Sequence, residues 1–287
     1  MPNAWGRKGL NFGFVRWLNL RNSLGDDVRP IFHEPWYKPE SRDRPWRYAL
    51  PPLQRRMARG VLNASSTVYV TIPHWERLLR PYAKTARFVG LPVPSNVPFV
   101  DDPVRVAEIR KRVAGDSPLV IGTFGTYREE IAPRLHQILP RVLNTPERVG
   151  LLIGRNGPQF ATSLPQSSSR IVATGGLAPR EVALYLQACD VLIQPYRDGV
   201  TTRRGTLMAC LCQGKAVVTT QGAMTEPVWR NSGCVALVPD RDTSAFVSAI
   251  EDLVKNRESR RSLGELARQV YVREFALERT IETLLKD

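Results

Sequence analysis

The sequence predicts an α/β protein whose second part is built on a doubly wound parallel sheet. From residue 119 onward, short apolar runs alternate with segments of helical periodicity, which is the order expected of a chain of βαβ units. The runs are short and apolar, as in strands that are buried on both faces of a parallel sheet. The best-defined unit covers residues 190–220, where a strand, a polar loop, a helix, a glycine and a second strand follow one another.

The first part of the chain contains a less regular alternation of helices and strands. In chain order, the pattern predicts a helix over 10–24, a strand over 28–32, a helix over 53–62, a strand over 67–71, a helix over 75–82 and a strand over 88–93. The first helix carries Phe12, Val15, Leu18 and Leu20 among polar residues. A basic, proline-bearing loop is expected over 38–47.

A stretch rich in turn formers, residues 94–103, predicts a linker between the two parts. The expected domains are therefore 1–102 and 103–287. Asp101 and Asp102 could form an acidic metal-binding pair, or they could cap the helix that follows. Because Pro103 and a helical pattern come directly after them, capping is favoured.

The second part alternates regularly between strands and helices. Strands are expected over 119–124, 149–153, 170–173, 190–193, 216–219 and 235–238. Helices are expected from Glu129, over 178–187, around Leu207 to Leu211, and over 244–253, 259–270 and 277–285. Gly214 stands where a helix C-terminus commonly has glycine.

The charge is large and unevenly distributed. The chain has a net charge of +14, and residues 1–100 contain 16 Lys and Arg against 6 Asp and Glu, a net +10. This asymmetry indicates an anionic partner for the first part, which could be nucleic acid, an anionic bilayer or a phosphorylated substrate. Basic helices with interleaved tryptophans fit peripheral membrane contact at least as well as nucleic acid, and no nucleic-acid-binding module pattern is present, so nucleic acid is disfavoured.

Several function classes are excluded or disfavoured by the sequence. No apolar run approaches the ~18 residues of a membrane-spanning helix. The N-terminus lacks the apolar core of a signal peptide, and the scattered cysteines (Cys189, Cys210, Cys212 and Cys234) favour reduced thiols over a metal site, so a cytoplasmic location is expected. Neither a P-loop nor a Gly-x-Gly-x-x-Gly motif occurs, which disfavours those nucleotide sites.

Glycine-bearing loops follow three of the expected strands, at Gly125, Gly154 and Gly175-Gly176. Any one of them could simply serve a tight turn. Three such loops at one sheet edge, beside Arg128 and the pair Arg203-Arg204, indicate a nucleotide phosphate site. The arginine pair precedes a predicted helix, where the helix dipole disfavours cations unless a bound anion compensates. The same loop carries Asp198 and Gly199.

One histidine of the first part stands at the end of an expected strand. His33 begins the run His-Glu-Pro-Trp-Tyr, which ends with aromatic side chains that could stack on a sugar. A lone histidine is usually structural, and the strand-end position makes a role in a site equally plausible.

The second part resembles the donor-binding domain of a GT-B-fold glycosyltransferase and is most similar to glycosyltransferase family 4. The resemblance covers residues 104–287. It is carried by the motif Ala-Cys-Asp-Val-Leu-Ile-Gln-Pro-Tyr at 188–196, by Asp198-Gly199 and by the helix-Gly-strand motif at 205–220. Thr-Gly-Gly-Leu at 174–177 is similar to the family's loop whose backbone meets the nucleobase, so Gly176 and Leu177 are implied as donor contacts.

The resemblance implies transfer of a sugar from a nucleoside-diphosphate sugar, with retention at the anomeric carbon, no metal and no cofactor besides that substrate. Arg128, Arg203 and Arg204 would neutralise the diphosphate, with Arg204 as a catalytic group. Gly125, Gly154, Asp198, Gly199 and Thr206 would line the donor. The family's paired glutamates lie eight residues apart. Here the second position is Ala209, and Asp198 stands near the first position but about three residues early, so ribose recognition either falls to Thr206 or Thr202 or is weaker.

Residues 1–102 resemble only the rear half of the family's Rossmann-like acceptor domain. His33 and Glu34 stand where many members have a strand-end His-Asp or His-Glu, which implies a catalytic role for both on the acceptor side. A full domain of this kind needs about 150 residues, so its first strands are expected to be missing, either because the start is misassigned or because the protein is short. The last helix is expected to pack back on this part.

The resulting hypothesis is a cytoplasmic glycosyltransferase that acts on a lipid-linked or glycan-precursor acceptor. Contact with an anionic membrane surface, at its inner face, is a further expectation. The alternative is a truncated, non-catalytic relative that binds a nucleotide or a protein partner, which the missing strands and Ala209 favour.

Overall fold

A computed structural model describes residues 6, 9–39, 44–115, 119–128, 131–165 and 170–286. The chain forms two compact units. The first consists of Met1–Pro92 with Glu282–Asp287, and the second of Val93–Ile281. Among the residues described, no helix is both long and apolar enough to cross a membrane.

The second unit contains a six-stranded parallel sheet with the order β6-β5-β4-β7-β8-β9. Its strands are β4 (Leu119–Phe124), β5 (Arg148–Ile153), β6 (Arg170–Ala173), β7 (Val191–Gln194), β8 (Ala216–Gln221) and β9 (Ala236–Pro239). Its helices are α4 (Pro103–Ala114), α5 (Ala132–Val142), α6 (Gly157–Ser163), α7 (Pro179–Gln187), α8 (Gly205–Cys212), α9 (Pro227–Ser232), α10 (Thr243–Lys255) and α11 (Arg257–Val270), followed by a π-helical turn at Tyr271–Phe275 and α12 (Leu277–Lys286). The parallel sheet confirms the predicted fold class.

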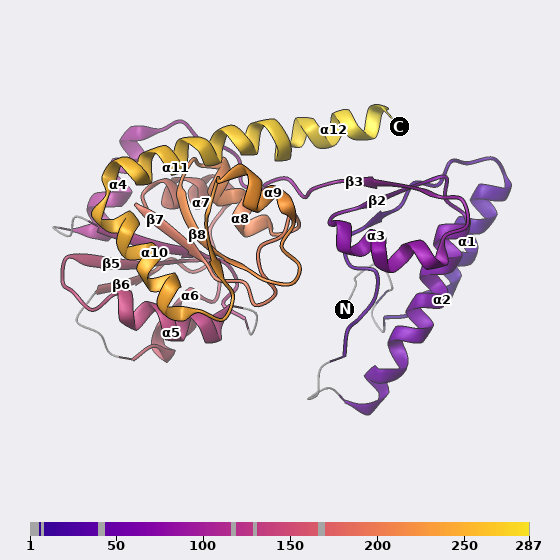
Figure 1. Ribbon diagram of the computed structural model, residues 1–287, viewed down its shortest axis with the longest axis horizontal. Coiled ribbons are helices and arrows are strands. Elements are labelled where there is room, and N and C mark those ends of the chain that lie inside the picture. The colour runs from indigo at the N-terminus through magenta and orange to yellow at the C-terminus, as the bar shows by residue number, and fades with distance from the viewer. Residues whose placement is uncertain are drawn as a thin grey trace. The chain divides into compact units, whose positions relative to one another are not determined.

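The sheet is covered on both faces (Figure 1). Helices α5 and α10 pack on each other on one face, with α10 against β7, β8 and β9, whereas α4 packs with α7, and α8 with α11, on the other. The chain leaves β4 toward β5 and leaves β7 toward β8, so the direction of winding reverses between the adjacent strands β4 and β7. Such a reversal opens a crevice at the carboxyl ends of the two strands, where open α/β sheets bind ligands.

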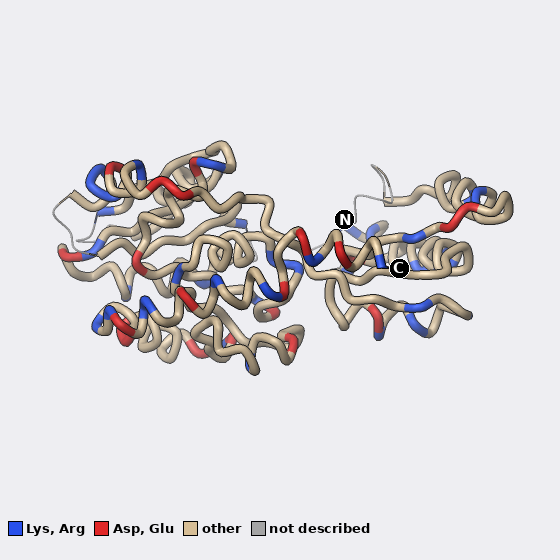
Figure 2. Tube along the Cα trace, turned by 90° about the horizontal axis from the view of Figure 1, so that it is seen from above, with Lys and Arg blue, Asp and Glu red and all other residues tan. Residues whose placement is uncertain are grey.

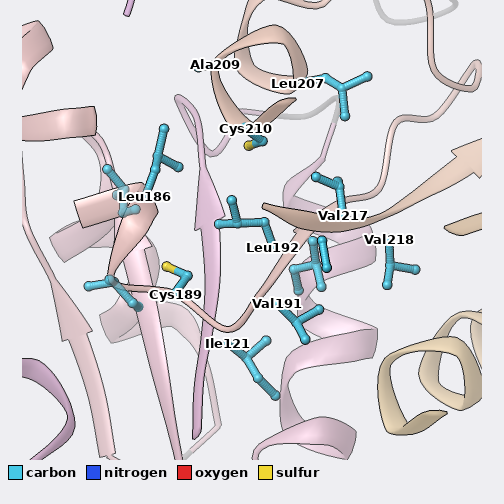
Figure 3. Packing of buried hydrophobic residues seen from close by; sticks show 14 of the residues in the cluster. Ile121, Leu186, Cys189, Val191, Leu192, Leu207, Ala209, Cys210, Val217 and Val218 are labelled. Atoms are coloured by element: carbon cyan, nitrogen blue, oxygen red, sulfur yellow. The ribbon is translucent and has the colours of Figure 1, made fainter. Parts of the chain in front are cut away.

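The core of the second unit lies between the sheet and its helices (Figure 3). Leu186 and Cys189 lie beside Ile121 and Val191, and Leu207 and Cys210 cover the sheet from α8. All four cysteines of the chain are buried and form no disulfide. Burial raises the pKa of the Cys189 thiol to about 12. A Cβ on Gly122 would lie 2.3 Å from Cys189 Sγ, so this glycine makes room for the thiol.

The first unit contains a three-stranded parallel sheet in the order β1-β2-β3. Its elements are α1 (Phe12–Ser23), β1 (Ile31–Phe32), a 3₁₀ helix (Pro45–Ala49), α2 (Leu50–Asn63), β2 (Thr67–Val70), α3 (Pro73–Leu79), a second 3₁₀ turn (Arg80–Tyr82) and β3 (Arg87–Gly90). The strand expected over 28–32 is reduced to its last two residues and an isolated bridge between Val28 and Ser65. Pro30 explains the difference, because it has no N–H to donate to a ladder.

The linker expected over 94–103 is packed against the second unit. Val97 and Val100 are buried in the core of that unit, and Gln213 donates a hydrogen bond to the Pro98 carbonyl. Residues 93–102, assigned by the sequence to the first part, therefore belong to the second. The Asp102 carboxylate accepts a hydrogen bond from Arg105 N at 3.0 Å, which confirms the predicted N-cap of α4.

Three short helices were not predicted from the sequence. They are α6, α9 and the 3₁₀ helix within the basic loop, and each begins with proline at its first or second position. A helix of five to seven residues shows too few turns for periodicity to be visible. The start expected at Glu129 falls outside the described residues, and α5 begins at Ala132.

Candidate functional site

The loops that follow β4, β5, β6 and β7 all lie at the carboxyl edge of the sheet in the second unit. Because parallel strands end at the same edge, the topology places the glycine loops and the arginine pair around the point where the winding reverses. Gly125, Arg128, Gly154, Gly176 and Arg204 all stand on these loops. The predicted donor residues therefore share one edge.

Gly154 is required by the approach of two loops to each other. Its φ of +131° and its position against Gly125 exclude a side chain, because a Cβ there would lie 2.1 Å from the Gly125 carbonyl oxygen. Gly125 N donates to the Ile153 carbonyl at 3.0 Å, and Gly154 N donates to Thr174 Oγ1 at 3.2 Å. These contacts join the loops after β4, β5 and β6 into one platform.

Tyr127 fixes the loop that presents Arg128. It is a non-glycine residue with positive φ, +52°, and its hydroxyl donates to the carbonyls of Thr123 at 2.8 Å and Ile153 at 3.0 Å. Its ring stacks on Phe160 at 5.1 Å, and burial raises its pKa well above the usual range. The next side chain, Arg128, is exposed. Nothing in the sequence pattern pointed to a role for Tyr127.

The loop after β6 is the open part of the edge. A Cβ built on Gly175 or Gly176 meets no atom within 4 Å, and Gly176 is exposed. Leu177 is half-buried against the core. Backbone groups of Gly176 are therefore accessible to a flat ligand, while Leu177 anchors the loop.

The arginine pair stands at the start of α8, as predicted. Arg204 is the N-cap residue, both arginines are half-buried, and the first turn of α8 carries no acidic residue. The Arg204 guanidinium lies over the Tyr196 ring, with 4.6 Å between Cζ and the ring centroid. Tyr196 is buried, and its oxygen lies 2.7 Å from Thr206 Oγ1. A Cβ on Gly125 would lie 4.0 Å from Thr206 Cγ2. The platform formed by the loops after β4, β5 and β6 therefore lies next to the N-terminus of α8.

Asp198 and Gly199 form the outer turn of the same loop. Gly199 has a φ of +85°, and a Cβ there would lie 2.2 Å from Gly222 N in the loop after β8. Met224 N donates to the Asp198 carbonyl at 3.1 Å, whereas the Asp198 side chain is exposed. The role of Gly199 is therefore to let two loops touch.

A buried carboxylate, not predicted as a site residue, anchors this loop. Glu226, 7% exposed, accepts hydrogen bonds from Thr202 N at 3.0 Å and Thr202 Oγ1 at 2.6 Å through one oxygen. Its other oxygen accepts from Trp229 Nε1 at 2.8 Å. We call Thr202, Glu226 and Trp229 the carboxylate clamp. Its signal in the sequence was an acidic residue directly before the proline that begins α9.

The position of the second paired glutamate carries no carboxylate here, whereas Asp198, near the first position, is exposed. Ala209 is fully buried in α8, and the residue eight positions earlier, Thr201, is fully buried as well. The Thr201 Oγ1 atom has no hydrogen-bond partner among the described residues. Within the described chain, no group of three or more His, Cys, Asp and Glu side chains could hold a metal ion.

His33 and Glu34 belong to the first unit, directly after β1. Both side chains are exposed, and Thr71 Oγ1 donates to the carbonyls of Phe32 and His33, each at 3.4 Å. Their strand-end position is as predicted. They lie in a different unit from the arginine pair.

Residues 117–256 match the sequence profile of the family described as Glycosyl transferases group 1. None of the curated protein sequences compared matches the chain.

Solved structures of glycosyltransferases share the fold. Sucrose-phosphate synthase from Thermosynechococcus elongatus has a TM-score of 0.70 at 18% identity, covering 96% of this chain and 70% of that one. HepE of Anabaena, in complex with UDP, has a TM-score of 0.72 at 12% identity, covering 96% of this chain and 75% of that one. WaaG, a glycosyltransferase involved in lipopolysaccharide biosynthesis, has a TM-score of 0.66 at 12% identity, and the match covers 97% of this chain and 82% of that one. The expected resemblance to GT-B glycosyltransferases is confirmed.

The close approach of Gly125 and Gly154 gives the first prediction. We expect Gly154→Ala to lower the free energy of unfolding by roughly 2–4 kcal/mol, because its φ and the Gly125 carbonyl both exclude a Cβ. Gly176→Ala is the matched control, since nothing lies within 4 Å and its φ is not positive. Urea denaturation measures both. Equal stability of the two variants would show that the platform does not depend on this contact.

The second prediction concerns the carboxylate clamp. Glu226→Gln turns one of two acceptor oxygens into a donor that faces either Trp229 Nε1–H or Thr202 N–H. We expect a loss of about 1–3 kcal/mol in unfolding free energy. The control is Glu265→Gln on the exposed surface in the middle of α11, which should change stability by less than about 0.5 kcal/mol. A variant as stable as the control would contradict the assigned role.

Proposed function

We propose that this chain, a glycosyltransferase by the group 1 match of residues 117–256, moves a sugar from a nucleoside-diphosphate sugar to a lipid-linked or glycan-precursor acceptor. The anomeric configuration is retained and no metal ion is required. The proposal rests on one observation above all: Arg203 and Arg204 flank the N-terminus of α8 at the carboxyl edge of the sheet.

The charge at this edge suits a diphosphate. The N–H groups at the N-terminus of a helix carry partial positive charge, so two adjacent arginines raise an already positive potential. A bound anion relieves that cost and gains charge-assisted hydrogen bonds from the guanidinium groups. The stack of Arg204 on Tyr196 restricts the guanidinium before a ligand arrives.

The same arginines stabilise the diphosphate as it departs. When the bond between the anomeric carbon and the diphosphate breaks, negative charge grows on the diphosphate oxygens. Fixed positive groups that meet this growing charge lower the barrier without reorganising, which is the usual task of a metal ion in other transferases. Arg204 and Arg203 take this role, and Arg128, held out by the Tyr127 anchor, adds a third cation.

The nucleobase and the ribose of the donor are bound by groups that are accessible in the structure. The open backbone at Gly176 suits the face of a nucleobase, and Thr206, half-buried beside Tyr196, offers a hydroxyl to the ribose in place of the carboxylate missing at Ala209. The similarity to HepE, whose structure contains UDP, supports a nucleotide donor. His33 and Glu34 serve the acceptor side.

The acceptor and the location follow from the charge of the first part. Its net +10 favours an anionic membrane surface, at which a lipid-linked acceptor is available, and a cytoplasmic protein that binds there peripherally. The similarity to WaaG, which is involved in lipopolysaccharide biosynthesis, supports an acceptor of this kind.

A second candidate is a non-catalytic relative that binds a nucleotide or a protein partner. The buried Ala209, at the position where the resemblance leads one to expect the second glutamate, favours it. Turnover separates the two candidates.

The experiment that tests the function is a donor screen in two steps. Thermal shift with nucleoside diphosphates and their sugars identifies the donor, and a released-nucleotide assay with that donor then measures turnover. We expect EDTA to change the rate by less than about twofold, because fixed arginines neutralise the diphosphate. Stabilisation by a nucleotide sugar without release in any acceptor mixture would favour the non-catalytic candidate. Loss of turnover in EDTA would exclude metal independence.

A further prediction concerns Arg204. We expect Arg204→Ala to lower kcat by roughly 100-fold or more, because charge that grows in the transition state loses its partner. The matched control is Arg257→Ala, another arginine at the start of a helix but exposed and distant in sequence. Melting temperatures show whether either variant is misfolded. Unchanged donor-dependent turnover in a folded Arg204→Ala protein contradicts the assignment.

A further inference from the structure

The end of β7 begins a chain of hydrogen bonds that leads to α8. Gln194, the last residue of β7, is fully buried, and its Nε2 donates to the Phe124 carbonyl at 3.0 Å. Because a carbonyl can only accept, this contact identifies the nitrogen end of the amide. The Oε1 end therefore faces Tyr196, whose hydroxyl donates to it at 3.2 Å.

Tyr196 passes this polarity on to Thr206. Burial raises the pKa of Tyr196, so its hydroxyl keeps its proton. That single proton is donated to Gln194, so the Tyr196 oxygen can only accept from Thr206 Oγ1, which lies 2.7 Å away. Thr206 is therefore the donor in this contact. We call Gln194, Tyr196 and Thr206 the hydroxyl relay.

Thr206 is left with lone pairs and no free proton for a ligand. A threonine hydroxyl has one proton and two acceptor lone pairs, and here the proton is committed to Tyr196. Thr206 is half-buried in the first turn of α8, next to Gly125 of the platform. A ligand hydroxyl can donate to these lone pairs, whereas an ionised phosphate oxygen has no proton to give and is repelled. The hydroxyl relay therefore suits the ribose of a nucleotide and not its diphosphate.

The helix that carries Thr206 provides no acidic acceptor. Helix α8 contains no Asp or Glu, and Figure 2 marks where the acidic residues lie along the described chain. A carboxylate presents only acceptor oxygens to ribose hydroxyls. With its proton committed to Tyr196, the neutral hydroxyl of Thr206 presents the same polarity without adding a negative charge beside the diphosphate.

We propose that Tyr196 is a positioning residue that sets donor specificity: it holds Thr206 as an acceptor that selects a nucleotide bearing a ribose hydroxyl. Its ring has a separate task, because the Arg204 guanidinium lies over it, with 4.6 Å between Cζ and the ring centroid. One buried side chain thus orders the group that meets the diphosphate and the group that meets the ribose. This inference rests on the proposed function, since it requires a nucleotide at this edge of the sheet.

The experiment is a calorimetric titration of the whole chain with nucleoside diphosphates. The probes are UDP, CDP, ADP and GDP, each in the natural form and with fluorine in place of the 2′- or the 3′-hydroxyl. Fluorine occupies the position of the hydroxyl but cannot donate a hydrogen bond. We expect the native chain to bind one of the two fluoro forms roughly three- to tenfold more weakly than the natural form, because a hydrogen bond to Thr206 is lost.

Two variants break the hydroxyl relay at different points. Tyr196→Phe keeps the ring under Arg204 but releases the Thr206 proton, which can then point to the fluorine. The difference between the natural and fluoro forms should therefore fall below about twofold. Thr206→Val removes the acceptor itself, so the natural form should lose its advantage in this variant as well.

Tyr185→Phe is the matched control. Tyr185 is half-buried on α7, its hydroxyl accepts from Arg112 at 2.6 Å, and the same guanidinium lies over its ring. This variant should keep the native difference between the natural and fluoro forms. Melting temperatures show whether each variant is folded. A variant that is only more loosely packed would bind both forms more weakly by the same factor.

Three outcomes would overturn the inference. They are equal binding of the natural and both fluoro forms by the native chain, an unchanged difference in folded Tyr196→Phe, and a Thr206→Val chain that binds both forms more weakly by one factor. The last would assign Thr206 to the diphosphate or to the fold alone. Turnover alongside any of these results would leave the proposed function standing, and selectivity without turnover would leave the inference standing. Failure of all four nucleotides to bind would overturn both.

Discussion

The arginine-bearing loop is anchored by the buried carboxylate of Glu226. Arginine is long and flexible and a helix N-terminus disfavours its charge, so the two arginines depend on a well-ordered loop. Glu226 fixes Thr202, immediately before the pair, by bonds to its backbone and hydroxyl, and Trp229 holds the carboxylate from the other side. A ligand then meets arginines whose loop is already ordered, so less conformational entropy is lost on binding.

The glycines at the carboxyl edge of the sheet have two different roles, because some permit loops to pack together and one leaves the backbone accessible to a ligand. Gly154 and Gly199 are explained by contacts between loops, since both would collide with backbone atoms if they carried a Cβ. Gly176 has no such constraint and lies open. Gly154 and Gly199 allow the loops to pack into a rigid platform. A ligand can approach the backbone at Gly176, which lies open. The glycines that the backbone conformation requires are therefore different from the glycine that a ligand can approach.

Much of the second unit was predictable because its central strands are buried on both faces. The apolar run of β4 defines that strand to the residue, and the half-buried edge strand β6 also has its predicted bounds. Gly214, with a φ of +65° after α8, was recognised by its position alone. The short helices were missed because they contain too few turns to show a period. The carboxylate clamp was missed for a different reason: Thr202 and Glu226 are 24 residues apart, and only the pairing of β7 with β8 brings their loops together.

The burial of all four thiols has a consequence for the chemistry of the protein in a cell. Thiolate is the form that reacts with peroxide, disulfides and alkylating agents, and burial raises the pKa of Cys189, Cys210, Cys212 and Cys234. None of them lies at the surface, so oxidation has to wait until the core opens. The rate at which a thiol reagent labels the chain is thus set by the opening of the second unit. Cysteine labelling therefore reports the unfolding of that unit.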